Sequence, residues 1–89
     1  MRFEWDQRKA KDNLRKHGIS FEEARTVFDD PRVVVMADLA HSGSEDRFWA
    51  IGRAASSSIL LVCYCYRGSD RIRIFSARKA TRSESKLYR

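Results

Sequence analysis

The chain has 89 residues and a net charge of +6, with 34% charged and 43% hydrophobic residues. This length supports one small domain over residues 1–89. No stretch approaches the roughly 18 consecutive apolar residues of a membrane-spanning helix, so we expect no membrane association. The start of the chain lacks the apolar run of a signal peptide, which predicts a cytoplasmic protein.

The positive charge is unevenly distributed along the chain. Residues 1–40 hold eight basic and eight acidic side chains, and residues 41–66 hold two of each. Residues 67–89 hold eight basic side chains against Asp70 and Glu84, so the whole surplus of six lies in the last quarter. This asymmetry indicates a polyanionic partner, and we expect nucleic acid because no amphipathic basic helix accompanies it to favour a membrane.

The first third of the chain predicts a short strand and two helices. The alternation over Phe3–Asp6 predicts a short strand that ends at an N-cap aspartate, and Gly18 supplies the left-handed residue that ends the first helix. Ser20-Phe21-Glu22-Glu23 has the pattern of a capping box that opens a second helix. We expect that helix to end at Asp29-Asp30-Pro31, because the residue before a proline disfavours the helical conformation.

Four strands are predicted in the middle and last thirds. Val33–Met36 is continuously apolar, which is typical of a strand with little solvent contact. Arg47–Arg53 is the next strand, with Gly52 allowing a bend, and Ile59–Tyr66 is the expected centre of the sheet. Arg71–Ala77 completes the set, and the short turns between strands require antiparallel pairing. The predicted fold class is α+β, with helices on one face of an antiparallel sheet of about four strands and a short C-terminal helix.

The stretch Arg71–Thr81 joins an alternating strand to a helix start. Alternation divides the strand into one face with Ile72, Ile74, Ser76 and Arg78 and another with Arg71, Arg73, Phe75 and Ala77. A guanidinium cannot follow isoleucines into the core without a partner, so Arg78 is expected at the rim of the sheet or in a cleft. A capping box at Thr81-Arg82-Ser83-Glu84 would then place a helix N-terminus beside Arg78, a geometry that favours phosphate. The alternative is an edge strand with solvated charges.

The polar loop before Arg47 holds groups that metal-independent RNA cleavage needs. His41 and Glu45 can act as acid or base, and Arg47 can stabilise phosphorane charge. Alternatively, His41 and Glu45 only make local hydrogen bonds in a hairpin loop. We expect no metal or cofactor, because Cys63 and Cys65 have no second ligand pair and are expected as small core residues.

A series of different short motifs extends along nearly the whole chain. They are Phe3-Glu4-Trp5-Asp6 with Lys9, Asn13 with Lys16-His17-Gly18, Ser20-Phe21-Glu22-Glu23-Ala24, Phe28-Asp29-Asp30-Pro31, Asp38, His41-Ser42, Glu45-Asp46-Arg47, Ile51-Gly52-Arg53, Ile72 to Arg78, Ala80-Thr81, Glu84 and Tyr88. In order and spacing they resemble the BrnT-type toxins, the RelE-like ribonuclease half of bacterial type II toxin–antitoxin pairs. The turn Ala54–Ser58 departs from the pattern, because it lacks an expected glycine.

The resemblance implies a RelE-like endoribonuclease that inhibits translation by cleaving RNA. It also implies a small BrnA-like antitoxin with a ribbon-helix-helix part, which neutralises the toxin and binds operator DNA. The residues that match the family pattern are, in decreasing order of fit, Arg78 and Arg47, then Glu45, His41, Arg53 and Tyr88. Further RNA contacts are expected from the basic residues Arg67, Arg71, Arg73, Lys79, Arg82 and Lys86.

In the predicted mechanism, Arg78 and Arg47 stabilise the pentavalent phosphate formed when the 2′-hydroxyl attacks. Glu45 or His41 accepts the 2′-proton. Tyr88 or Lys79 assists the leaving group, and Tyr88 could instead stack on a base. Two rival functions are a non-catalytic nucleic-acid-binding module that uses the same basic face and a structural subunit of a regulatory complex.

Overall fold

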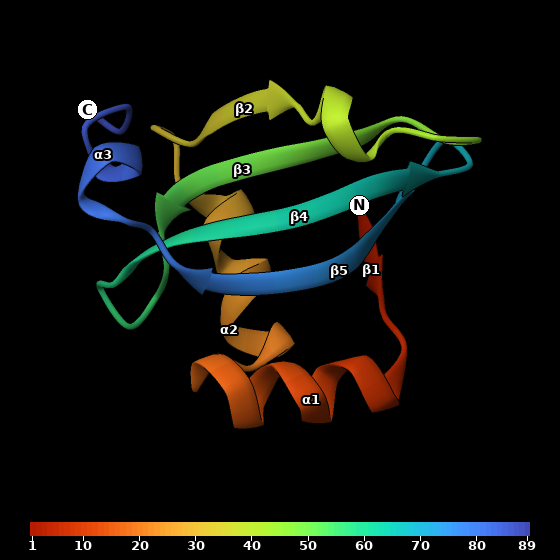
Figure 1. Cartoon of the computed structure of the whole chain (residues 1–89), viewed down its shortest axis with the longest axis horizontal. Helices are drawn as coiled ribbons and strands as arrows, with labels where there is room; N and C mark the ends of the chain where they lie inside the picture. Colours follow the sequence, from red (N-terminus) through yellow and green to blue (C-terminus); the bar gives the residue numbers. More distant parts are fainter.

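A five-stranded sheet carries two helices on one side, and the structure, a computed structural model, describes residues 1–89 (Figure 1). The elements in chain order are β1 (Arg2–Glu4), α1 (Gln7–His17), α2 (Phe21–Arg25), the 3₁₀ turn η1 (Thr26–Asp29), β2 (Val34–Ala37), the 3₁₀ turn η2 (Leu39–His41), β3 (Arg47–Arg53), β4 (Ile59–Arg67), β5 (Arg71–Lys79) and α3 (Arg82–Ser85). None of the helices is long and apolar enough to cross a membrane. We call the face covered by α1 and α2 the helix side, and the face toward the viewer in Figure 1 the open side.

The predicted α+β class is confirmed, but the sheet is mixed and has five strands. The strand order is β1-β5-β4-β3-β2, with β4 at the centre as expected. β1 pairs parallel with β5, matching Arg2 with Arg71 and Glu4 with Arg73. Sequence patterns do not reveal this pairing, because β1 has three residues and its partner lies near the other end of the chain.

The caps confirm the predicted starts of both helices and the predicted end of α1. The Asp6 carboxylate accepts hydrogen bonds from the backbone N–H groups of Arg8 and Lys9 at 2.8 and 3.1 Å. Gly18 closes α1 in the left-handed conformation with φ of 71°, which only glycine adopts without steric cost. The Ser20 hydroxyl accepts from Glu23 N–H, but α2 ends at Arg25, earlier than predicted, and the chain tightens into η1 before it reaches Pro31.

The hydrophobic core lies between the helices and the sheet. Phe21, Ala24 and Val27 form an apolar stripe and are fully buried, as is Tyr64 on β4. Full burial of a large apolar side chain contributes about 1.5–3 kcal/mol, so this stripe holds α2 and η1 on the sheet. Gly52 is needed for close packing rather than for a bend, since a Cβ atom there would lie 2.8 Å from Val27 Cγ1.

One local prediction requires correction, and the departure from the family pattern in the turn after β3 has a structural consequence. β2 was expected to have little solvent contact, but it is the edge strand of the sheet, and Val35 is 48% exposed. The turn after β3 lacks the expected glycine, and Ser57 takes the left-handed conformation there with φ of 77°. Serine tolerates this conformation less well than glycine, so the turn folds at some cost in backbone strain.

A β-bulge in β5 changes which of its side chains face the core. Cys63 pairs with Ser76 and the next residue, Tyr64, pairs with Ile74, so Phe75 is the extra residue. Ile72 and Ile74 face the core as predicted, but Ala77 joins them in place of Ser76. The prediction that Arg78 shares the face of the isoleucines is therefore wrong, because the bulge moves Arg78 to the open side.

The buried side chain of Asn13 holds this bulge. Its amide nitrogen donates to the carbonyl oxygens of Ile19 and Ala77, both at 2.8 Å, and its amide oxygen accepts from Ala77 N–H at 3.1 Å. Pairing with β1 extends along β5 only as far as Arg73, so the backbone of Ala77 has no strand neighbour on that side. Asn13 therefore supplies the hydrogen bonds that a strand would have made.

We predict that Asn13→Ala lowers the free energy of unfolding by about 2–4 kcal/mol, because it leaves buried backbone groups of Ala77 and Ile19 unsatisfied. Urea unfolding followed by circular dichroism measures the effect. Lys11→Ala, on the exposed side of the same helix, is the control and should change stability by less than about 0.5 kcal/mol. Equal stability of the two variants would show that β4 alone maintains the bulge.

Candidate active site

A cavity of about 270 Å³ opens on the open side of the sheet, and we call it the open-side pocket. It is lined by Asp38, His41, Arg47, Trp49, Leu61, Cys63, Phe75, Ser76 and Arg78. Trp49, Cys63 and Ser76 form one row across strands β3, β4 and β5. The small side chains of Cys63 and Ser76 leave space on the floor of the pocket, between the larger aromatic rings.

Two arginines reach this space from opposite ends. Arg47 begins β3 in a row with Cys65, whereas Arg78 lies near the end of β5 in a row with Leu61, so the two rows flank the floor of the pocket. The Arg47 guanidinium carbon lies 4.0 Å from the centre of the Phe75 ring, within the range of a cation–π contact. Arg47 makes none of the ion pairs in the structure, which leaves its charge available to an anion.

Arg78 is positioned by a carboxylate from α3. Its two terminal nitrogens donate to the two carboxylate oxygens of Glu84 at 2.8 and 2.9 Å, a bidentate pair. The hydrogen bonds from Arg78, together with the backbone N–H of Thr81, lower the pKa of Glu84 to about 2 against the opposing effect of burial. Glu84 also completes the predicted capping box with Thr81, so the end of α3 that was expected to bind phosphate already holds the chain's own carboxylate.

Asp38 and His41 form a hydrogen-bonded pair at the other side of the pocket. Nδ1 of His41 lies 3.0 and 3.1 Å from the two carboxylate oxygens of Asp38. An ionised carboxylate only accepts, so Nδ1 is the donor, and in the neutral imidazole this tautomer leaves Nε2 as the acceptor. Asp38 has 5% and His41 has 69% of its side chain exposed, which means that a fixed buried group orients an accessible ring.

Asp38 is ionised despite its burial. Desolvation raises its pKa, but polar contacts with the Trp49 indole and the His41 ring outweigh burial and hold the pKa below the ordinary value. The loop that carries His41 is closed by a hydrogen bond from Asp38 N–H to the carbonyl of Arg47 at 2.8 Å. Loop closure thus fixes Asp38 and His41 relative to the first residue of β3.

Sequence reasoning missed Asp38 and Trp49 as site residues. The spacing of Asp38 and His41, three residues apart in a short turn, is the signal that could have suggested the pair. Cys63 was expected in the core with Cys65, but only Cys65 is fully buried and Cys63 lines the pocket. Burial raises the pKa of the Cys63 thiol, which keeps it protonated. No group of three or more His, Cys, Asp or Glu side chains is arranged to hold a metal ion.

Several predicted site residues lie outside the open-side pocket. Glu45 pairs with Arg67 at 3.3 Å. The Tyr88 hydroxyl donates to Asp30 at 2.6 Å, and the Arg53 guanidinium lies 5.7 Å from the Tyr88 ring. The structure therefore brings together Arg78, Arg47 and His41 but places Glu45, Arg53 and Tyr88 elsewhere.

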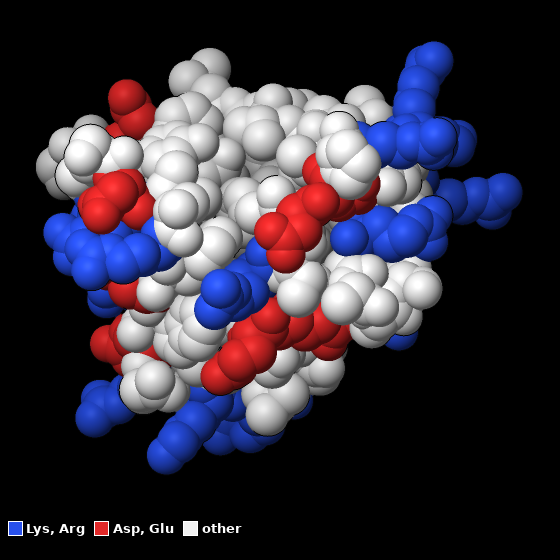
Figure 2. Space-filling model, turned by 180° about the vertical axis from the view of Figure 1, so that it is seen from behind, with Lys and Arg blue, Asp and Glu red and all other residues white.

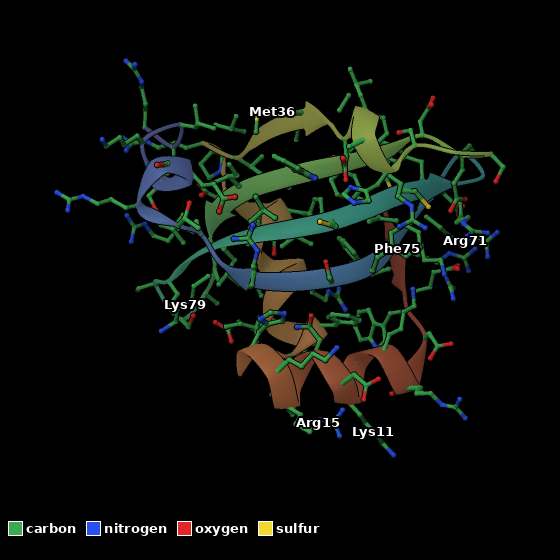
Figure 3. The ribbon with its side chains drawn as sticks, viewed as in Figure 1. Lys11, Arg15, Met36, Arg71, Phe75 and Lys79 are labelled. Atoms are coloured by element: carbon green, nitrogen blue, oxygen red, sulfur yellow. The ribbon has the colours of Figure 1, made fainter.

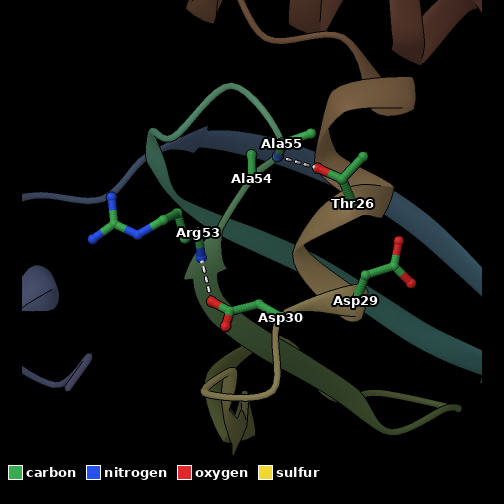
Figure 4. A pocket seen from close by; sticks show the side chains of 6 residues that line it. All are labelled: Thr26, Asp29, Asp30, Arg53, Ala54 and Ala55. Carbon is green, nitrogen blue, oxygen red and sulfur yellow. Dashed lines mark hydrogen bonds between the residues drawn. The ribbon is translucent and has the colours of Figure 1, made fainter.

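Arg53 lines a second hollow of about 300 Å³, shown in Figure 4. There the backbone N–H of Arg53 donates to the Asp30 carboxylate at 2.7 Å, and Ala55 N–H donates to the Thr26 hydroxyl at 2.8 Å. These groups already satisfy one another and fasten η1 to the turn after β3. We interpret this hollow as a structural junction rather than a reaction site.

The remaining basic residues differ in their surroundings. Arg71 and Arg73 both pair with Glu4, at 3.1 and 2.8 Å, whereas Lys79, Arg82 and Lys86 make none of the ion pairs. On the helix side, basic and acidic side chains lie next to one another (Figure 2). The helix side therefore offers a polyanion no continuous positive surface.

Comparison with known proteins adds evidence on the family. The sequence model of the family described as the ribonuclease toxin BrnT of type II toxin–antitoxin systems matches residues 5–84. A similar solved structure is the 1.1 Å crystal structure of the Brucella abortus ribonuclease toxin BrnT, with a TM-score of 0.71 and 25% sequence identity. That match covers 92% of this chain and 99% of the Brucella chain. No curated protein matches the sequence.

The ion pair of Arg78 and Glu84 predicts a pH-dependent contribution to stability. Because folding lowers the pKa of Glu84 from 4.5 to about 2, the contribution is complete above pH 4.5 and disappears as the pH falls toward 2. Arg78 is 39% exposed, so solvent screening reduces the contribution to about 1–2 kcal/mol. We expect Glu84→Gln to lower stability by that amount at pH 7 and to equal the parent near pH 2, as measured by denaturant unfolding.

The control for this experiment is Asp46→Asn, which removes an exposed carboxylate without an ion pair. It should track the parent at every pH. A stability difference for Glu84→Gln that stays constant across the pH range would show that the capping hydrogen bonds, not the charge pair, make the contribution.

Proposed function

The chain belongs to the BrnT family of ribonuclease toxins of type II toxin–antitoxin systems, and we propose that its RNA-cleaving centre is the open-side pocket. The observation that carries this proposal is the meeting of Arg47, Arg78 and His41 in one cavity. Two guanidinium groups can neutralise a phosphate in the transition state, and an oriented imidazole can accept a proton. Together these groups suit cleavage by the RNA's own 2′-hydroxyl.

In the proposed reaction, Nε2 of His41 accepts the proton of the 2′-hydroxyl. The 2′-oxygen then bonds to the adjacent phosphorus, and the bond from phosphorus to the 5′-oxygen of the next nucleotide breaks. The departing 5′-oxygen takes up a proton from water, leaving a 2′,3′-cyclic phosphate and a 5′-hydroxyl end, and His41 later returns its proton to water. Asp38 acts as a positioning residue, because it fixes the His41 tautomer and stabilises the imidazolium that forms.

Arg47 and Arg78 supply the positive charge for this reaction, so the proposed mechanism is metal-independent. A planar guanidinium can donate to two phosphate oxygens at once, which favours the trigonal-bipyramidal phosphorane over the ground state. Phe75 and Glu84 restrict the two side chains before substrate arrives. Restricted donors reorganise little during the reaction, and this is where their catalytic advantage originates.

Trp49 and Phe75 give the pocket its aromatic walls. Bases of single-stranded RNA stack on aromatic rings, at about 1–3 kcal/mol per base. We propose that these rings hold the bases that flank the scissile phosphate. Glu45 and Tyr88 take no part in this scheme, since they are bonded to Arg67 and Asp30 outside the pocket.

We expect RNA cleavage in excess EDTA at the rate found without it, with 2′,3′-cyclic phosphate and 5′-hydroxyl product ends. Arg78→Ala should reduce kcat by about 10²–10³, because it removes one transition-state charge. Arg78→Lys should recover only part of the rate, since lysine cannot make the bidentate contact. Arg32→Ala, an exposed arginine outside both hollows, is the control. Loss of activity in EDTA or 5′-phosphate ends would refute the mechanism.

The same assay separates catalysis from mere binding and distinguishes the two candidate bases. His41→Ala should lose about 10²-fold or more, whereas Glu45→Ala should stay within a few-fold of the parent. The reverse order would assign the 2′-proton to Glu45. If Arg78→Ala weakens RNA binding while neither the parent nor any variant cleaves RNA, the non-catalytic binding module is the correct function.

We further propose that cleavage inhibits translation and that a small antitoxin neutralises the protein by covering the open-side pocket. Arg47 carries an unpaired charge there, and Arg78 is partly exposed, so a partner with acidic side chains would complement both. The family's type II organisation implies such a cognate protein partner. A ribbon-helix-helix part that binds operator DNA remains our expectation for it.

Expression in bacterial cells tests this regulatory proposal. The wild-type chain should stop incorporation of labelled amino acids, Arg78→Ala should not, and co-expression of the protein encoded by the adjacent reading frame should restore synthesis. Purification of the pair should yield a complex that does not cleave RNA. Wild-type expression at high level without slower growth would contradict the proposed activity.

A further inference from the structure

A third hollow adjoins the open-side pocket and has no role in the reaction described above. It measures about 240 Å³ and is lined by Lys9, Asp12, Asn13, Lys16, His17, Phe75 and Ser76. We call it the α1 groove, because five of these residues belong to that helix. Phe75 and Ser76 line both hollows, so the two join across the β5 bulge.

The groove exists because β1 is short. Its pairing ends at Arg73, and beyond that point α1 packs beside β5 through Asn13. Residues 9, 12, 13, 16 and 17 of α1 share one helix face, since they are spaced by three or four positions. Lys11 and Arg15 point away from the sheet, whereas Phe75 lies beside β5 above the helix (Figure 3).

The charges of the α1 groove favour an anion. The Lys9 ammonium lies 5.3 Å from the centre of the Phe75 ring, the same ring that contacts Arg47. Lys9 and Lys16 make none of the ion pairs, and the one carboxylate of the groove, Asp12, is engaged by Arg15 at 3.1 Å. Cationic groups therefore continue from Arg47, past Phe75, to the two lysines of α1.

We infer that the RNA strand downstream of the scissile phosphate crosses Phe75 and enters the α1 groove, where Lys9 and Lys16 contact its phosphates. The inference rests on the proposed function, because the position of the general base, His41, sets the direction of the RNA strand. His41 follows β2 at one edge of the sheet and would contact the 2′-hydroxyl of the upstream nucleotide. The downstream nucleotides then extend toward β5, and α1 is the next element beyond it.

Phe75 is placed to serve both parts of this path. As the extra residue of the bulge, it lies between the two hollows. Arg47 from the open-side pocket and Lys9 from the α1 groove both lie near its ring. A base that stacks there would put its neighbouring phosphates within the positive region. The charge count along the sequence misses this site, since acidic residues on other faces make residues 1–40 neutral as a whole.

The first test measures binding of an RNA with a 2′-O-methyl group at the cleavage position, which prevents attack. A double variant, Lys9→Gln with Lys16→Gln, is compared with Arg8→Gln plus Lys11→Gln, which removes two exposed charges of the same helix outside the groove and leaves the pair of Arg15 with Asp12 intact. Each lost phosphate contact should reduce the slope of log affinity against log salt by about 0.7. We therefore expect a slope reduced by about 1.4 for the first pair and unchanged for the second.

The second test establishes the direction of the strand. RNAs extended only downstream or only upstream of the modified nucleotide are compared, and the Lys9 and Lys16 variant should lose affinity only for the downstream series. A loss of affinity confined to the upstream series would contradict the proposed strand direction. Equal salt slopes for the two double variants would contradict RNA binding in the α1 groove.

The experiments distinguish failure of the proposed catalytic function from failure of the α1-groove inference. If the parent chain binds RNA through Lys9 and Lys16 but cleaves no RNA, RNA binding in the α1 groove is supported and the proposed catalytic activity is refuted. Cleavage with no dependence on these lysines, in binding or in KM for long RNAs, would refute the inference while leaving the catalytic pocket intact.

Discussion

The geometry of both hollows depends on one buried amide. Asn13 bonds to the backbone of Ala77 and Ile19, and so it holds the end of α1, the turn after it and the bulged part of β5 in one arrangement. Without the bulge, strand alternation would turn Arg78 toward the helices, where an arginine has no partner. With it, Arg78 faces the cavity and Phe75 stands at its border. A residue that contacts no substrate thus determines where the charged groups lie.

The two arginines and His41 share a second property, which is that a neighbouring side chain holds each of them. Glu84 holds Arg78, the Phe75 ring lies against Arg47, and the buried Asp38 holds the His41 ring. A long side chain that is already restricted loses less conformational entropy when it binds a phosphate. The carboxylate of Glu84 offsets part of the Arg78 charge, so the site gains order at the expense of some electrostatic attraction.

Much of the architecture follows from local chemistry that a sequence shows directly. Asp6, Gly18, Ser20 and Thr81 determine helix ends through caps, and the limits of β3 agree with the pattern of its residues. The bulge could not be predicted, because it depends on a hydrogen bond between residues 64 positions apart. For the same reason the sequence indicated Arg47, Arg78 and His41 but gave no basis for excluding Glu45 or Tyr88, whose positions depend on ion pairs and hydrogen bonds formed only in three dimensions.

The order of the strands has a consequence for the synthesis of this toxin. The open-side pocket needs residues from η2 and β3 together with the end of β5, and β1 has no partner until β5 is present. Arg78 lies 37 positions after His41, and Glu84 is later still. A growing chain therefore contains most of its core residues long before it can contain its site. The ribosome that makes the toxin therefore synthesises β1 to β4 before an assembled ribonuclease can exist.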